Sequence, residues 1–297
     1  MFEDLFKSGS ISAVNATLSG SLTPEQAHNF IDATKDNSSF LSKVTLEKMG
    51  RLQKELDAWD VARGVLVRVP SGDRPTEAQR TKMGLVGCKL EAKAVQLFAR
   101  VLQDALEDNK SNPKFEEQTF SAFTKAFGND IVNLGFSGVS DTYDGRFATL
   151  NKGWIQIAKE SEIATKITYA EADTVTKRLV AVAKSINADA LNDSVILISS
   201  ADYQSYNEEL SKNAAVGLII EGNAKKILGV ALEVNPYMQN GVYLATPLKN
   251  LVCGTVLDIR RNRWYENEER ALKYVFEVFC DYEIVVKKWV TISTLVV

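Results

Sequence analysis

Histidine and cysteine are scarce in this 297-residue sequence, and their scarcity argues against several kinds of reactive site. The one histidine, His28, has no nucleophile or carboxylate at a fixed spacing beside it, so a Ser–His–Asp type of triad is a poor interpretation. The three cysteines, Cys88, Cys253 and Cys280, form no C-x-x-C pair, which argues against a zinc site or a disulfide framework. Free cysteines fit the reducing environment of a cytoplasm best.

Phosphate-binding loops and membrane segments are missing as well. No G-x-G-x-x-G or G-x-x-x-x-G-K-S/T motif occurs, and no window approaches ~18 uninterrupted apolar residues. The first four residues, Met-Phe-Glu-Asp, do not resemble the start of a signal peptide. A net charge of −3 gives no global reason to expect nucleic-acid binding, whereas 45% hydrophobic residues can build a large core. We therefore expect a globular protein that is not an enzyme and has no catalytic residue, cofactor or metal.

Two polar clusters have both a structural and a functional interpretation. Asp141 and Asp144-Gly145 resemble part of a calcium loop, but the full spacing of acidic ligands is absent, so a tight turn is favoured. The segment 260–264, Arg-Arg-Asn-Arg-Trp, has the composition of a phosphate contact. Because no basic stripe accompanies it elsewhere, we interpret it as an exposed loop.

A capped apolar helix near the middle of the chain organises the sequence. Asn112 is a good N-cap, Pro113 suits the first turn, and Gly135 suits the position just after the last turn. Apolar residues between these ends recur every three or four positions, which places them on one helical face. They are Phe120, Phe123, Phe127, Ile131 and Leu134. Because this face carries no reactive group, we interpret the helix as a structural spine.

The first 45 residues are polar and predict an arm that contains one helix. Residues 23–26, Thr-Pro-Glu-Gln, have the pattern of a capping box, and Ala27, Phe30 and Ile31 form a narrow apolar face. A helix this short is marginal alone, so its face must pack on this subunit or on another.

A strand at residues 43–46 and a long hairpin are predicted next. Val65, Val67 and Val69 alternate along the outgoing strand of the hairpin, and residues 85–92 alternate on the return. Residues 70–75 have turn composition, which gives the hairpin a tip of roughly 15 residues.

The hairpin and the segment after it carry opposite charge. Residues 63–93 hold seven basic residues against three acidic ones, whereas residues 104–117 hold five acidic residues against two basic ones. One interpretation is two solvated faces, since exposed ion pairs contribute little. The other is a contact between subunits. Its basic candidates are Arg63, Arg68, Arg74, Arg80 and Lys82, and its acidic candidates are Asp104, Glu107, Asp108, Glu116 and Glu117.

The second half of the sequence alternates helices and strands, which makes the chain α+β. A helix is predicted over 174–188, with Val175, Leu179, Val182 and Ile186 on one face, and a buried strand over 195–198 leads into a helix capped by Ser200 that reaches about Asn213. Further strands are predicted at 227–234, 242–246, 254–259, 272–280 and 282–292. The unit at 195–213 has the order of a nucleotide-binding βα unit, but its turn contains no glycine.

Several short motifs occur in an order that resembles a known family. They lie at 37–44, 87–88, 134–138, 150–156, 242–251 and 278–282. In this order the sequence resembles the major capsid proteins of tailed phages, which have the HK-type shell fold, and it is most similar to the branch of temperate contractile-tailed phages of the peduovirus type. The resemblance spans most of the chain, and each motif is structural.

The resemblance implies an N-terminal arm, an extended β-hairpin loop, a peripheral domain with a long spine helix, and an axial domain. The implied segments are 1–45 for the arm, 46–94 for the first strand and the extended loop, 95–160 for the peripheral domain, 161–265 for the axial domain and 266–297 for C-terminal strands that return to the peripheral domain. The loop would lie over an adjacent subunit.

The family also implies the partners of this chain. They are further copies of the chain, arranged as hexamers and pentamers of an icosahedral shell, a separate scaffolding protein, a portal, and packaged double-stranded DNA held by non-specific contact; a decoration protein is a further candidate. No membrane is implied, and the virion capsid would be assembled in the cytoplasm of a bacterial host. Two alternatives stay open, namely the shell of an encapsulin-like compartment and a small α/β enzyme that acts on a nucleotide.

Overall fold

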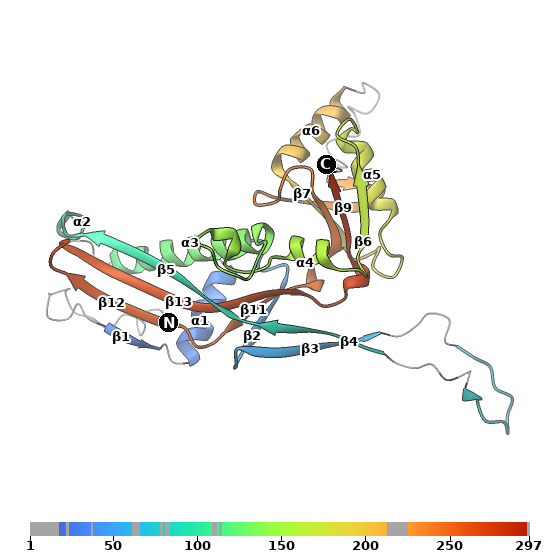
Figure 1. Ribbon diagram of the computed structural model, residues 1–297, viewed down its shortest axis with the longest axis horizontal. Coiled ribbons are helices and arrows are strands. Elements are labelled where there is room, and N and C mark those ends of the chain that lie inside the picture. Colours follow the sequence, from blue (N-terminus) through green and yellow to red (C-terminus); the bar gives the residue numbers. More distant parts are fainter. Residues whose placement is uncertain are drawn as a thin grey trace.

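The computed structural model describes residues 18–21, 24–36, 38–60, 66–77, 80, 84–108, 112, 115–212 and 225–295. These residues form two lobes and a hairpin that projects from the first lobe (Figure 1). Each lobe is built on a six-stranded sheet, so the chain is α+β, as predicted.

The first lobe is a long sheet with two helices on one face. Its strands follow the order β1 (Leu18–Ser21), β12 (Arg260–Glu266), β13 (Ala271–Ile284), β11 (Leu251–Val256) and β2 (Thr45–Met49), and β5 (Lys93–Leu102) pairs with the other edge of β13. The helices are α1 (Pro24–Asp36) and α3 (Phe115–Ser137), and a short α2 (Gln103–Asp108) follows β5. Every second side chain of β13 is buried, because the strand alternation turns that side toward the helices.

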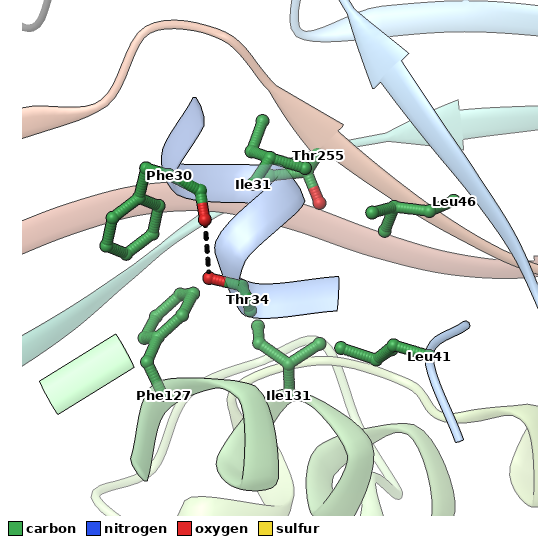
Figure 2. Close-up of a pocket in the computed structure, with 8 residues that line it drawn as sticks. All are labelled: Phe30, Ile31, Thr34, Leu41, Leu46, Phe127, Ile131 and Thr255. Carbon is green, nitrogen blue, oxygen red and sulfur yellow. Dashed lines mark hydrogen bonds between the residues drawn. The ribbon is translucent and has the colours of Figure 1, made fainter. Parts of the chain in front are cut away.

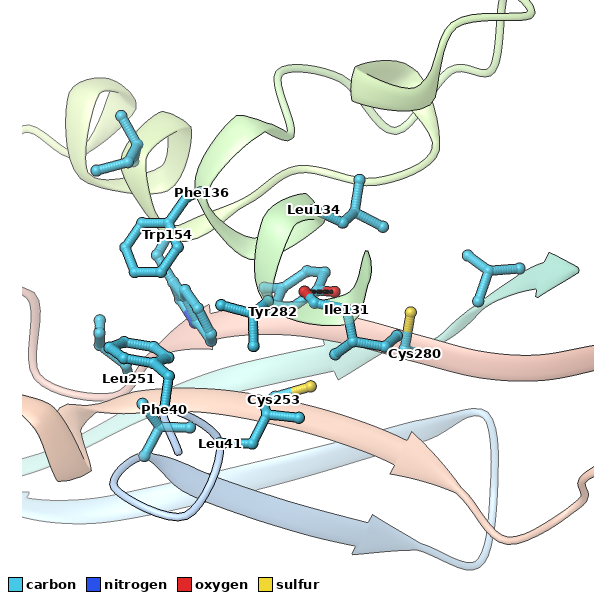
Figure 3. Close-up of a cluster of buried hydrophobic side chains, with 14 of the residues drawn as sticks. Phe40, Leu41, Ile131, Leu134, Phe136, Trp154, Leu251, Cys253, Cys280 and Tyr282 are labelled. Atoms are coloured by element: carbon cyan, nitrogen blue, oxygen red, sulfur yellow. Dashed lines mark hydrogen bonds between the residues drawn. The ribbon is translucent and has the colours of Figure 1, made fainter. Parts of the chain in front are cut away.

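The apolar stripe of α3 packs on β13, which confirms the predicted spine. The ring of Phe123 lies 5.6 Å from that of Tyr274, and the hydroxyl of Tyr282 donates to the carbonyl oxygen of Ile131 at 2.7 Å (Figure 3). Phe127, Ile131 and Leu134 are buried. The side chain of Phe120 lies outside the described residues.

The predicted helix end at Gly135 is wrong. The helix α3 continues to Ser137, and the amide of Gly138 donates to the carbonyl oxygen of Leu134 at 2.8 Å. A Cβ at Gly135 would lie 2.5 Å from Cζ3 of Trp154, so glycine is needed for close approach of the indole ring. The helix is described only from Phe115 onward. The proline predicted in its first turn, at residue 113, lies outside the described residues.

The helix predicted in the arm is α1, and it packs within its own subunit. The ring of Phe30 lies 5.8 Å from that of Phe127 and 6.3 Å from that of Phe276. Ala27 and Ile31 are buried beside it, as the narrow apolar face predicts. The capping residue at position 23 lies outside the described residues.

The second lobe is a sheet with both of its helices on one face. Its strands follow the order β6 (Thr165–Tyr169), β14 (Thr291–Leu295), β10 (Tyr243–Pro247), β7 (Ser194–Ser199), β9 (Val230–Asn235) and β8 (Lys226–Ile227). The helices are α5 (Val175–Lys184), whose predicted apolar face is buried, and α6 (Ser200–Ser211). The N-cap of α6 is Ser199, one residue before the predicted cap at Ser200. The hydroxyl of Ser199 accepts from the amide of Asp202.

The projecting hairpin consists of β3 (Gln53–Asp60) and β4 (Gly84–Glu91), and Figure 1 shows it extending away from both lobes. The return strand is confirmed, but the outgoing strand predicted at 65–69 is wrong. Residues 66–70 have no regular structure. The last pair between the two hairpin strands is Asp60↔Gly84, and Asp60 comes before this segment in the chain. Val67 and Val69 therefore lie beyond the paired strands, and Val65 lies outside the described residues.

Three further predictions of secondary structure need correction, one of a loop and two of strands. Residues 260–264 are not an exposed loop, because β12 pairs along β13 from Arg260↔Glu277 to Glu266↔Ala271 and Arg263 is buried. The two strands predicted at 272–280 and 282–292 are one strand, β13, followed by the separate β14. The strand predicted at 227–234 is a tight hairpin of β8 and β9, turned at Leu228 and Gly229, which both have positive φ.

The sheets divide the chain differently from the predicted segments. Strands β11 and β12, at 251–266, belong to the first sheet, although they fall within the predicted axial segment of 161–265. Strand β14, within 266–297, belongs to the second sheet and pairs with β6 and β10. The reason is that long-range pairing with β13 and β10, and not sequence proximity, decides the lobe of each strand. A short α4 (Trp154–Glu160) lies between the lobes (Figure 1).

Candidate subunit-contact surfaces

The basic candidates that the structure describes lie on the loop of the projecting hairpin. Arg68, Arg74 and Arg80 are exposed, and Arg80 forms an ion pair with Glu77 of the same loop at 3.2 Å. A turn at Gly72, whose φ is 99°, reverses the chain at this end. The candidates Arg63 and Lys82 lie outside the described residues.

The acidic candidates lie at the opposite end of the molecule. Asp104, Glu107 and Asp108 are exposed on α2, which Figure 1 places at the far end of the first lobe from the hairpin loop. Glu116 and Glu117 lie in the first turn of α3, but their side chains are outside the described part of the chain.

Sequence reasoning missed acidic residues that the fold adds to this end. The turn between β12 and β13 contributes Glu268 and Glu269, because the carbonyl oxygen of Arg270 accepts from the amide of Gln103 at 2.9 Å and so joins the turn to α2. Glu269 forms an ion pair with Lys273 at 2.7 Å. We call Asp104, Glu107, Asp108, Glu268 and Glu269 the acidic tip. The acidic tip consists of α2 and the turn between β12 and β13, and the pairing of β5 with β13 brings these two segments together. No local sequence pattern predicts that pairing.

Apolar side chains accompany both charged ends. On the hairpin loop, Leu66 is 95% exposed and Val67 is 52% exposed, next to Arg68. Near the acidic tip, the outward face of β5 exposes Phe98 at 71% and Leu102 at 51%. Large apolar groups left in water on projecting elements are typical of surfaces that another chain covers. Since the two charged ends are far apart in one subunit (Figure 1), only separate copies can bring them together.

The base of the hairpin is held by a partly buried carboxylate. Asp281 of β13 accepts from the amide of Glu91 at 2.6 Å and from Nδ2 of Asn151 at 3.2 Å. Burial, opposed by these hydrogen bonds, raises the pKa of Asp281 to about 6. Beside it, Nζ of Lys93 donates to the carboxylate of Asp141 at 2.6 Å. These contacts fix the point where the hairpin leaves the first lobe.

The turn that contains Asp144 is confirmed as a structural turn. The carboxylate of Asp144 accepts from Arg146 and from the hydroxyl of Thr149, and these hydrogen bonds hold its pKa well below the usual range. Within the described ranges, no group of three or more His, Cys, Asp or Glu side chains is placed to hold a metal ion.

A small apolar cavity lies between α1, α3 and β11. It is lined by Phe30, Ile31, Thr34, Leu41, Leu46, Phe127, Ile131 and Thr255 (Figure 2). Its volume is about 10 Å³, and the hydroxyl of Thr34 in its lining already donates to the carbonyl oxygen of Phe30 at 2.9 Å. A space of this size holds at most one water molecule, so it is a packing defect of the core.

The βα unit of the second lobe has no phosphate site at its turn. The Ser199 hydroxyl is used as the cap of α6, and the carboxylate of Asp202 accepts from the amide of Gly241 at 2.6 Å. An acid in the first turn would repel a phosphate. The described helices include none that is long and apolar enough to cross a membrane. Cys88, Cys253 and Cys280 are free thiols, and all three are buried.

Comparison of the fold with solved structures gives matches over the whole chain. A chain of the satellite phage P4 procapsid, in a structure that includes the size determination protein, matches with a TM-score of 0.71 at 14% identity, covering 91% of this chain and 99% of that one. The capsid of an empty GTA particle matches with a TM-score of 0.64 at 10% identity, covering 100% and 97%. This chain has the HK-type capsid fold.

The same fold extends to a virus-like particle from Pyrococcus furiosus, with a TM-score of 0.53 at 10% identity and coverage of 91% of this chain and 98% of that one. No family model matches the sequence, and no curated protein matches it. The HK-type fold is therefore evident from the backbone, while sequence identity to these neighbours is too low to assign the chain to one branch of the fold.

Proposed function

We propose that this chain is the major capsid protein of a tailed phage, and that copies of it self-assemble into an icosahedral shell around double-stranded DNA. The observation that carries the proposal is the match to capsid subunits over 91–100% of this chain.

The subunit contact that we propose joins the hairpin loop of one copy to the acidic tip of the next. The loop supplies Arg68, Arg74 and Arg80 with the exposed Leu66, and the tip supplies its carboxylates with the exposed Phe98. Such a head-to-tail contact uses two different patches, so it closes into rings when the rotation between copies permits. Each exposed ion pair contributes only about 0.2–1 kcal/mol, but the contact repeats at every subunit of a shell.

The contact is tested by reversing charge on both sides. The double variant Arg74→Glu, Arg80→Glu should leave the subunit folded and abolish or strongly reduce particle yield in electron micrographs. Reversing Asp104 and Glu107 to Arg in the same chain should restore yield, because opposite charges face each other again. Normal yield and salt tolerance of the first variant would show that the loop does not use these charges.

The remaining partners are proposed from the family resemblance. They are a separate scaffolding protein, a portal, a decoration protein and the packaged DNA, with assembly in the cytoplasm of the host. The peduovirus-like branch is likewise a proposal, which rests on the order of the short sequence motifs.

An encapsulin-like compartment is the second candidate, favoured by the match to the Pyrococcus virus-like particle. The higher TM-scores of the two capsid matches favour a genome container. Particles purified from the native source decide between them. Packaged DNA with a portal at one vertex supports the phage capsid, whereas an enclosed enzyme with no nucleic acid supports the compartment.

A further inference from the structure

The chain passes between the two lobes at three connections, and their geometry sets the angle between the lobes. The first runs from α4 to β6 at 161–164, the second from β10 to β11 through residues 248–250, and the third from β13 to β14 at 285–290. The second and third each join a strand of one sheet directly to a strand of the other.

Apolar packing alone does not fix this angle. Side chains from both lobes meet in one buried cluster, where Ile155 of α4 joins Leu244 and Ile292 of the second sheet. Burial of such side chains stabilises the junction, but the hydrophobic effect is non-directional, so a seam of this kind tolerates small sliding and rotation. Directional contacts are needed to select one arrangement.

Asn250 supplies those directional contacts. Its Nδ2 donates to Oγ1 of Thr246 in β10 at 3.0 Å and to the carbonyl oxygen of Val286 in the third connection at 3.0 Å. Its Oδ1 accepts from the amide of Val286 at 2.7 Å, which also fixes the orientation of the side-chain amide. The Asn250 side chain is buried, and its carbonyl oxygen accepts from the amide of Val285 at 3.2 Å.

The same connection is anchored to the first sheet on its other side. The hydroxyl of Thr45 at the start of β2 donates to the carbonyl oxygen of Lys249 at 2.7 Å. Lys249 is thus bonded to the first sheet. The next residue, Asn250, is bonded to Thr246 of the second sheet and to Val286 of the third connection. A change in the angle between the lobes would have to break this set of bonds.

We propose that Asn250 is the positioning residue that fixes the angle between the lobes, and that this angle sets the curvature and hence the size of the shell. The inference rests on the proposed shell function. In a closed shell every copy contributes the same angle, so a small change in each subunit adds up to a different diameter or to a shell that does not close.

The test compares two buried asparagines that differ in place. Asn250→Ala removes the bonds between the connections. Asn235→Ala is the matched control, because Asn235 is also buried but its Oδ1 accepts from the amide of Tyr237 at 2.9 Å, within the second lobe and away from the connections. Particle diameter is measured by electron microscopy, and folding of the subunit by denaturant unfolding. Thr246→Val, which removes a single bond from Asn250, serves as a milder variant.

The expected result is loss of the single particle diameter for Asn250→Ala, with open or mixed-size shells. We expect a smaller shift for Thr246→Val and an unchanged diameter for Asn235→Ala at similar loss of stability. Wild-type diameter in both junction variants would overturn the inference. If Asn250→Ala does not fold, Thr246→Val decides: a shifted diameter supports the inference and an unchanged one refutes it. Failure of the wild-type chain to form shells would instead contradict the proposed function.

Discussion

Replacing Gly135 by alanine tests the packing of the spine helix most sharply. An added Cβ would lie 2.5 Å from Cζ3 and 2.8 Å from Cε3 of Trp154, whereas carbon atoms in contact normally stay about 3.5–4.0 Å apart. The indole cannot retreat, because its Nε1 donates to the carbonyl oxygen of Val252 at 2.9 Å and its ring centroid lies 5.1 Å from that of Tyr282 and 5.4 Å from that of Phe136 (Figure 3).

The magnitude follows from two opposing effects. Alanine is favoured over glycine inside a helix by about 1 kcal/mol, whereas forcing an extra methyl group into a packed core costs roughly 1–3 kcal/mol or more. Because backbone and ring both resist movement at Gly135, we expect the overpacking to prevail and Gly135→Ala to lower the free energy of unfolding by about 2 kcal/mol.

Gly128→Ala is the control in the same helix. A Cβ at Gly128 would lie 3.2 Å from the carbonyl oxygen and 3.3 Å from Cγ2 of Thr34, so a shift of a few tenths of an ångström would accommodate it. Urea unfolding of the unassembled subunit measures both variants. Equal stability of Gly135→Ala and Gly128→Ala, or a stabilised Gly135→Ala, would refute the close approach of Trp154 to the helix.

Two further predictions concern titratable groups. Asp281 has a pKa of about 6 in the folded chain against 3.8 as its ordinary value, so the folded state binds this proton more tightly. The contribution of Asp281 to stability should be complete below pH 4 and fall by on the order of 1–3 kcal/mol as pH rises through 6, and Asp281→Asn should remove this part of the pH dependence. A pH profile of stability that is identical in Asp281→Asn and the wild type would contradict the raised pKa of Asp281. Burial raises the pKa of Cys88 to about 11 and that of Cys253 to about 12, so a thiol reagent at pH 8 should label neither until urea unfolds the chain, and rapid labelling of the native subunit would disprove the packing around them.

The helices could be predicted from the sequence because their signal is local. The residues Phe123, Phe127, Ile131 and Leu134 recur with the helical period, and the structure buries that face as expected. Gly135 misled the prediction, because a glycine at a helix end and a glycine under an aromatic ring look the same in one sequence. Only the contact with Trp154 distinguishes them.

The strands were harder to predict because their partners are distant in sequence. Asp281 interrupts an apolar run and indicates a strand break, yet β13 continues through it, since the amide of Glu91 and the side chain of Asn151 satisfy the carboxylate. Strand β5 was missed although Val95, Leu97 and Val101 alternate, because its pairing with β13 spans most of the chain.

The candidate contact surfaces were predictable in charge and not in extent. The basic loop and the acidic residues of α2 are evident from composition alone, and the structure adds Glu268 and Glu269 to the acidic tip through the pairing of β5 with β13. The contact between these surfaces is a prediction that awaits its charge-reversal experiment. Asn250 had no distinguishing signal in the sequence, since its importance arises from two connections that meet only in the fold.

Assembly of the purified chain tests the central claim most directly. The chain is expressed with and without the products of its neighbouring genes, and its mass is measured by light scattering before electron microscopy. We expect closed icosahedral shells of megadalton mass. A stable monomer or dimer under all of these conditions, with no shell in any micrograph, would contradict it.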